Sequence, residues 1–163
     1  MKKNKSSKPK MLPYKNPVLP AEKRVKDLLS RMTLEDKAAQ MVCVWREKAD
    51  KLVDAQGNFD FQKAKAAFKK GHAPGQVGRP SDAGPGKNAR GMAELTNAIQ
   101  KFFIENSRLG IPVVFHEECL HGHAAVEGTS FPQPIALAGT FNPELVESLF
   151  TATALEARSR AHN

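Results

Sequence analysis

An unbroken apolar segment, Ile-Pro-Val-Val-Phe at residues 111–115, most constrains how this chain can fold. It follows directly on a helical pattern that ends near Arg108 and Gly110. The apolar residues of that pattern recur at intervals of three and four: Met92, Leu95, Ile99, Phe102 and Phe103. A continuous apolar run after a helix is typical of a strand in a parallel sheet. We therefore predict a strand over residues 111–115, buried on both faces.

Two helices are predicted near the start of the chain. The apolar residues between Pro20 and Met32 have the spacing of an amphipathic helix. Thr33 stands three residues before Asp36, as in a capping box, so a second helix begins there. The apolar pattern that follows predicts that this helix runs through Val44.

Three shorter segments precede the central helix. Residues 46–58 are polar and predict a loop. Residues 59–69 fit a short helix that Gly71 would end. Residues 75–80 fit a short strand, and the Gly, Pro and Ser residues that follow as far as Lys87 favour a loop.

Two further segments follow the central strand. Residues 131–137 fit a strand or a buried turn, and a last helix begins at Thr140 or Asn142 and includes Leu155. Strands that alternate with helices indicate βα units. The sequence therefore predicts an α/β fold with a parallel sheet.

The net charge of +8 is concentrated at one end of the chain. No acidic residue occurs in the first fifteen positions, which hold six lysines: Lys2, Lys3, Lys5, Lys8, Lys10 and Lys15. Without these six, 19 basic residues face 17 acidic ones. We predict that residues 1–15 form a disordered, solubilising tail and that residues 16–163 fold. Weak phosphate binding by the tail is the alternative, and no specific nucleic-acid partner is expected.

Membrane, export and metal signals are weak. No apolar run approaches the roughly 20 residues of a transmembrane helix. Residues 11–17, Met-Leu-Pro-Tyr-Lys-Asn-Pro, do not have the apolar centre of an export signal. Cys43 and Cys119 form neither a CxxC pair nor a dense disulfide framework. The default expectation is a cytoplasmic protein without a membrane partner.

The segment 116–123, His-Glu-Glu-Cys-Leu-His-Gly-His, directly follows the predicted central strand. Ligands gather at the carboxyl ends of parallel strands, so this segment is the first candidate site. A zinc-binding helix needs two histidines four residues apart, whereas His116 and His121 are five apart. We predict no metal site here.

The adjacent carboxylates Glu117 and Glu118 suggest a hydrolytic pair of acid and nucleophile that face one substrate, and two further hypotheses for Glu118 alone. Neighbours on an extended chain point to opposite faces, so at most one of them can face a ligand. In one hypothesis Glu118 accepts hydrogen bonds from sugar hydroxyls. In the other, Glu118 pairs with Arg79, and His121 caps a turn before Gly122.

Several stretches carry a family resemblance. They are residues 27–37 (DLLSRMTLEDK), 107–112 (SRLGIP), 118–122 (ECLHG), 131–133 (FPQ) and 140–146 (TFNPELV). In order and approximate spacing they resemble the N-terminal domain of glycoside hydrolase family 3, which contains β-glucosidases and β-xylosidases. The resemblance runs from about Asn16 to the C-terminus.

The resemblance implies a (β/α)₈ TIM-type barrel, which takes about 250 residues, so this chain would be an incomplete barrel with roughly its first three βα units. It also implies that Glu118 contacts the sugar in subsite −1. His121, in the same segment, is a second substrate-binding candidate. His116, Glu117 and His123 are expected to be structural. The family's nucleophile and acid/base have no matching position here, so no catalytic residue is assigned.

The expected function is that of part of a retaining β-glycosidase that hydrolyses terminal β-linked glucose or xylose in carbohydrate metabolism. The isolated chain, without the rest of the barrel and a following domain, is expected to be inactive, and no metal or cofactor is expected. Two alternatives stay open. One is a non-catalytic carbohydrate-binding or interaction module, and the other is a weak nucleic-acid binder that uses the lysine-rich tail.

Overall fold

The computed structural model describes residues 11–160, which belong to two compact units divided between Lys37 and Ala38. Of the predicted tail, residues 1–15, the first ten residues lie outside the described part of the chain. Its last part, Pro13–Lys15, forms a short 3₁₀ helix (η1) in which Tyr14 is buried, so order begins earlier than expected. Within residues 11–160, no helix has the length and apolar character needed to cross a membrane.

The first unit contains η1 and helix α1 (Ala21–Arg31), which confirms the first predicted helix. Asp27 connects the two elements. Its carboxylate accepts a hydrogen bond from the backbone N–H of Tyr14 at 3.1 Å and two from the Arg31 guanidinium at 3.0 Å each. The Arg31 hydrogen bond lowers the pKa of the Asp27 carboxyl group.

Helix α2 (Leu34–Gln40) begins as predicted and ends early. The Asp36 carboxylate accepts from the Thr33 N–H at 2.9 Å, and the Thr33 hydroxyl accepts from the Asp36 N–H at 3.2 Å. This reciprocal pair is the expected capping box. The helix does not run through Val44, because Cys43–Val44 forms strand β1.

A close backbone approach at Gly75 explains the early end of α2. The Gly75 N–H donates to the carbonyl oxygens of Ala39 at 3.1 Å and Val42 at 3.2 Å, and the Gln76 N–H also donates to Val42. A Cβ atom on Gly75 would lie 1.9 Å from the carbonyl oxygen of Gln40. This long-range contact has no signature in the local apolar pattern, so the sequence prediction was wrong here.

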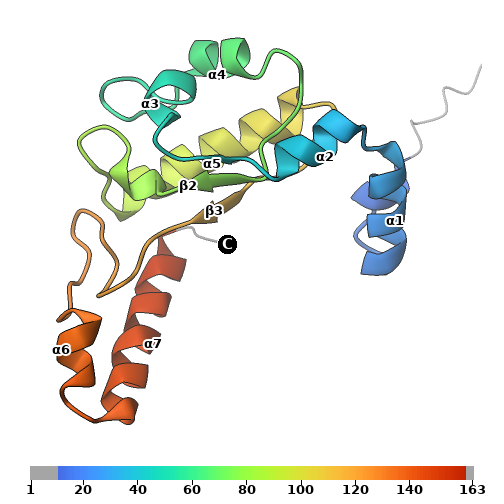
Figure 1. Ribbon diagram of the computed structural model, residues 1–163. Helices are drawn as coiled ribbons and strands as arrows, with labels where there is room; N and C mark the ends of the chain where they lie inside the picture. The colour runs from blue at the N-terminus through green and yellow to red at the C-terminus, as the bar shows by residue number, and fades with distance from the viewer. Residues whose placement is uncertain (1–10, 161–163) are drawn as a thin grey trace, which may run out of the picture. The chain divides into compact units, whose positions relative to one another are not determined.

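The sheet of the second unit has three parallel strands in the order β1-β2-β3, of which Figure 1 labels β2 and β3. Strand β2 spans Gln76–Gly78, and β3 spans Val114–His116. Val44 is paired with Val77, and Val77 with Phe115, so these three side chains lie on one face. The predicted parallel sheet and the predicted strand near residues 75–80 are confirmed.

Strand β3 differs in detail from the strand predicted over residues 111–115. It begins three residues later and includes His116. Val114 is 52% exposed, whereas Phe115 is 4% exposed. The prediction that both faces are buried is therefore wrong for this chain. The reason is that the described core packs against the Phe115 side.

Helix α5 (Ala89–Asn106) supplies much of the core and confirms the predicted central helix. Asn88 caps its start by accepting a hydrogen bond from the Gly91 N–H. The buried residues that α5 contributes to this core are Leu95, Ile99, Phe102 and Phe103. The ring centroids of Phe102 and Phe103 lie 5.2 Å apart in an edge-to-face arrangement, a geometry that aromatic pairs prefer.

Two short helices flank this core between β1 and β2. Helix α4 (Phe61–Ala67) confirms the helix predicted over residues 59–69. Helix α3 (Lys48–Lys51) lies where a loop was predicted, and Leu52 and Val53 follow it into the core. A single helical turn is too short to give a clear periodic signal. After β2, the loop expected from the sequence contains a 3₁₀ helix, η2 (Pro80–Asp82).

The chain after β3 ends in two helices, α6 (Pro134–Ala138) and α7 (Pro143–Ser159). Asn142 caps α7 through the Leu145 N–H, which confirms the last predicted helix. The predicted strand or buried turn over residues 131–137 is wrong, because Pro134 begins α6. Proline is favoured in the first turn of a helix, where its missing N–H costs little.

Candidate active site at the carboxyl ends of the strands

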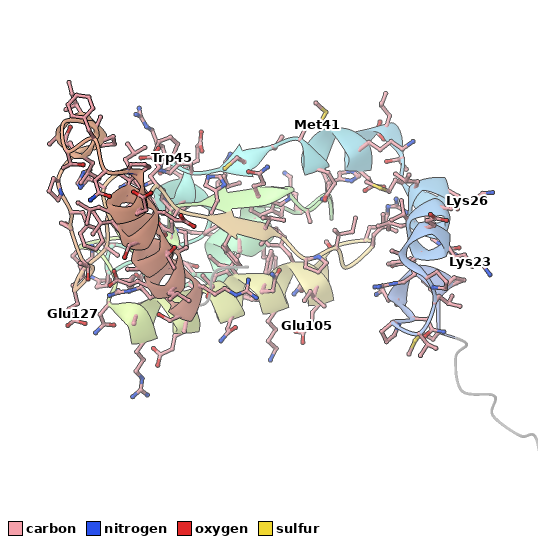
Figure 2. The ribbon with its side chains drawn as sticks, turned by 90° about the horizontal axis from the view of Figure 1, so that it is seen from below. Lys23, Lys26, Met41, Trp45, Glu105 and Glu127 are labelled. Atoms are coloured by element: carbon pink, nitrogen blue, oxygen red, sulfur yellow. The ribbon has the colours of Figure 1, made fainter. Side chains whose placement is uncertain are left out.

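Charged and aromatic side chains gather where the three strands end. Trp45 follows β1, Arg79 follows β2, and Glu117 and Glu118 follow β3. Because the strands are parallel and adjacent, their carboxyl ends lie at one edge of the sheet. Figure 2 labels Trp45, close to the end of β1.

Glu118 and Arg79 form an ion pair across this edge. The distance from Arg79 Nη1 to Glu118 Oε2 is 3.3 Å. The side chain of Glu118 is 49% exposed, and that of Arg79 is 25% exposed. The pairing weighed from the sequence therefore exists. It still leaves about half of the Glu118 side chain open to a ligand.

The backbone at Arg79 is unusual. Its φ of 48° and ψ of 60° are left-handed, which favours glycine and strains other residues. Its N–H donates to the carbonyl oxygen of His116 at 2.8 Å. These constraints turn the chain sharply after β2 and bring the guanidinium to 3.4 Å from Asp82 and 5.7 Å from the Trp45 ring centroid.

Glu117 points to a different partner from Glu118, as the extended chain requires. Its carboxylate accepts hydrogen bonds from the Ser81 N–H at 2.8 Å and the Ser81 hydroxyl at 2.6 Å. Ser81 is 2% exposed. Glu117 thus fixes the loop after β2 to the end of β3, which is the structural role expected for it.

The histidines of the segment 116–123 are spread over different environments. His116 belongs to β3, and its ring lies 3.1 Å from Gln76 Oε1 and 4.0 Å from Cys43 Sγ. His123 is buried, as expected for a structural residue. The His121 carbonyl oxygen accepts from Phe131 N–H at 2.7 Å. No direct bond joins the His121 ring to Glu118 among residues 11–160.

The chemistry of Cys119 differs from that of an activated thiol. Burial raises the pKa of the Cys119 thiol, and the negative charges of Glu117 and Glu156 raise it further. A raised pKa lowers the fraction of reactive thiolate at neutral pH. Over the described range, no three His, Cys, Asp or Glu side chains gather in a way that could hold a metal ion.

Lys48 and Asp82 complete the cluster, and the sequence analysis missed both. Lys48 comes from α3 and Asp82 from η2, and the Lys48 Nζ lies 2.8 Å from Asp82 Oδ1. The indole N–H of Trp45 faces Asp82 Oδ2 at 3.5 Å. Lys48 follows β1 and Asp82 follows β2 by only a few residues. This position after a strand is the one signal that could have identified them as site residues.

Two cavities differ in their chemistry. A cavity of about 320 Å³ borders Trp45, Lys48 and Asp82, next to the strand ends. A cavity of about 520 Å³ is lined by apolar side chains of α6, α7 and the turn between them, together with Asn142. The second lining has no titratable side chain, so the charged cluster at the strand ends is the better candidate for an active site.

The fold and this cluster define a class of protein, the parallel α/β proteins that bind ligands at the carboxyl ends of their strands. Within that class, a family model described as the glycosyl hydrolase family 3 N terminal domain matches residues 33–161. The chain belongs to glycosyl hydrolase family 3. Its fold is the TIM-type α/β fold of that domain, and its three parallel strands make up part of such a barrel.

Individual proteins agree with this assignment. A putative β-xylosidase from Formosa agariphila is 36% identical over 149 residues, which are 90% of this chain and 19% of that protein. β-Glucosidase C from Emericella nidulans is 33% identical over 156 residues, 87% of this chain and 24% of that protein. A solved β-glucosidase from Erythrobacter marinus has a TM-score of 0.72 and 36% identity, over 92% of this chain and 18% of its own. The chain thus spans roughly a fifth of the length of these relatives.

Proposed function

We propose that this chain forms one wall of the sugar-binding subsite of a β-glycosidase that acts on terminal β-linked glucose or xylose. In this proposal Glu118 is the sugar-binding carboxylate and His121 is a further contact. The single observation that carries it is that the Glu118 side chain, at the carboxyl ends of parallel strands, stays 49% exposed although Arg79 engages one of its oxygens. The β-glucosidases and β-xylosidases among its relatives support the substrate class.

The proposed role of Glu118 follows from its chemistry. An ionised carboxylate accepts hydrogen bonds only, and a sugar hydroxyl can donate to it over a short distance. Arg79 engages one oxygen, Oε2, and so restricts the rotation of the carboxylate. A restricted acceptor loses less freedom when a sugar binds, which favours a fixed orientation of the ring.

The cleavage step requires groups beyond those of this cluster. A retaining glycosidase places two carboxyl groups about 5 to 5.5 Å apart around the scissile bond. At the strand ends, Glu117 is bonded to Ser81 and Glu118 to Arg79. We therefore propose that these residues bind and orient the sugar, and that the nucleophile and the acid/base of the reaction are other residues of a whole family member.

The test is calorimetric titration of the chain with glucose and with xylose. Saturable binding of at least one sugar is expected. The substitution Glu118→Gln removes a charge-assisted acceptor and should weaken that binding about tenfold or more. The matched control is Glu105→Gln, because Glu105 is an exposed carboxylate on α5 and is labelled in Figure 2.

The outcomes separate the hypotheses. Equal binding by the Glu118→Gln and Glu105→Gln proteins would contradict the role of Glu118. Sugar-dependent stabilisation of the chain without hydrolysis would support a binding role and is also what a non-catalytic carbohydrate-binding module would give. The glycosidase hypothesis and the binding-module hypothesis differ in what they expect of a longer family member. The first expects it to hydrolyse β-glucosides or β-xylosides, and the second does not.

A further inference from the structure

Lys48 is the most enclosed charge at the strand ends. Only 5% of its side chain is exposed. Its ammonium group donates to the carbonyl oxygens of Trp45 at 2.8 Å and Gly78 at 3.0 Å. It also lies 2.8 Å from Asp82 Oδ1. An ammonium has three N–H donors, so these three oxygens match its full donor capacity and fix its position.

Lys48 therefore joins the ends of two strands. The carbonyl of Trp45 follows β1, and that of Gly78 ends β2. Net stabilisation is not the main consequence, because the desolvation of a buried ion pair offsets most of its attraction. The main consequence is geometric: Asp82 is held by one oxygen at a set place between the two strands.

The second oxygen of Asp82 continues the chain of contacts. Asp82 Oδ2 lies 3.4 Å from Arg79 Nε, an ion-pair contact without hydrogen-bond geometry, and accepts a hydrogen bond from the indole N–H of Trp45 at 3.5 Å. Arg79 in turn reaches Glu118 through Nη1. The charges alternate in sign from Lys48 through Asp82 and Arg79 to Glu118, so each group orients the next.

We infer that Lys48 is a positioning residue for Glu118: it holds Asp82, Asp82 holds Arg79, and Arg79 holds the carboxylate. This inference rests on the proposed function, in which Glu118 binds the sugar. Without Lys48, both oxygens of Asp82 become available to the planar fork of Arg79, which prefers two-point contacts with a carboxylate. The guanidinium then moves toward Asp82, and Glu118 loses the contact that restricts it.

The first test is the substitution Lys48→Met, which keeps an unbranched apolar stem and removes the charge. We expect sugar affinity to fall about three- to tenfold, since Glu118 must then be ordered when the sugar binds. The matched control, Lys65→Met, removes an exposed lysine from α4 and should leave affinity unchanged. Unchanged affinity in the folded Lys48→Met protein would overturn the inference.

A double-mutant cycle separates positioning from a general structural effect. If Lys48 acts through Glu118, then Lys48→Met should change affinity by less than about twofold when Glu118→Gln is already present. Fully additive losses would overturn the inference. Asp82→Asn offers a second route if the Lys48→Met protein does not fold. It weakens the hold on Arg79 while it keeps an oxygen acceptor for Lys48, and it should show the same non-additivity.

A spectroscopic readout decides the inference without any sugar. Trp45 is the only tryptophan of the chain, so its indole N–H gives a single assignable NMR signal. We expect Lys48→Met to shift this signal and that of the Arg79 Nε–H, and to shift the Glu118 carboxyl carbon. If no variant, nor the unaltered chain, binds sugar, the proposed function fails. The positioning claim then stands or falls on the shift at Glu118, and an unchanged signal there overturns it.

Discussion

At the scale of single residues, the sequence proposed Glu118 as a sugar contact and Arg79 as its partner, and it missed the residues around Arg79. Glu118 became a candidate because its segment follows a recognisable strand and because residues 118–122 (ECLHG) resemble the family. Lys48 and Asp82, which connect to Glu118 through Arg79, come from segments separated from it by more than thirty positions. Only the parallel pairing of three strands brings these segments together, and such pairing is not encoded in local spacing. His121 was predicted beside Glu118, and that prediction awaits the sugar titration.

The bond between Ser81 and Glu117 gives a prediction about stability. Ser81→Ala removes a hydroxyl that donates to a carboxylate at 2.6 Å in a buried setting. The free energy of unfolding should fall by about 1–3 kcal/mol, because a charged acceptor loses its partner. Urea denaturation measures this change. Ser130→Ala is the control, since Ser130 is exposed, and an equal midpoint for both variants would contradict the assigned role of Glu117.

At the scale of elements, long periodic patterns were reliable and short ones were not. Helices α1, α5 and α7 were all predicted, because each repeats its apolar spacing over several turns. Strand β1 has two residues and continues a helical apolar pattern, so nothing local distinguishes it from α2. Helix α6 has five residues, too few for a periodic apolar pattern, and the sequence predicted a strand or turn there.

Gly75 provides the test at this scale. The substitution Gly75→Ala places a Cβ 1.9 Å from the Gln40 carbonyl oxygen, so the backbone between α2 and β1 must move. We expect a loss of about 1–3 kcal/mol in the free energy of unfolding or more, as for other overpacked sites. Thermal and urea denaturation provide the measurement.

Gly91→Ala is the matched control for Gly75→Ala. Gly91 lies in α5, and a Cβ there approaches no atom closer than 3.3 Å, with only side-chain atoms of Asn88 and Lys87 nearby. Alanine is favoured over glycine inside a helix by about 1 kcal/mol. This variant should be at least as stable as the unaltered chain. If Gly75→Ala behaved in the same way, the explanation for the end of α2 would be wrong.

At the scale of the whole molecule, family membership and activity are different statements. The chain belongs to glycosyl hydrolase family 3, yet it spans between 18% and 24% of the length of the relatives described above. The three strands form one charged edge at their carboxyl ends. A TIM-type barrel builds its active site at the carboxyl ends of eight strands. Family membership therefore does not by itself establish activity, whereas sugar contact can be tested in this chain.

We expect the purified 163-residue chain to show no turnover of aryl β-glucosides or aryl β-xylosides. The physical reason is that Glu117 and Glu118 point to separate partners and cannot flank one glycosidic bond. Release of the aryl group, followed by its absorbance, measures the activity. Steady turnover that Glu118→Gln abolishes would show that the chain carries a complete site after all.

The central claim is that sugar binds at the carboxyl ends of the strands, against Glu118. An NMR titration of the isotope-labelled chain with glucose and xylose tests it most directly. The account predicts saturable shifts of the Glu118 and Arg79 amide signals and of the single Trp45 indole signal, which in the Glu118→Gln protein need sugar concentrations about tenfold higher or more. Saturable shifts confined to other parts of the chain, or no saturable shift with either sugar, would contradict it.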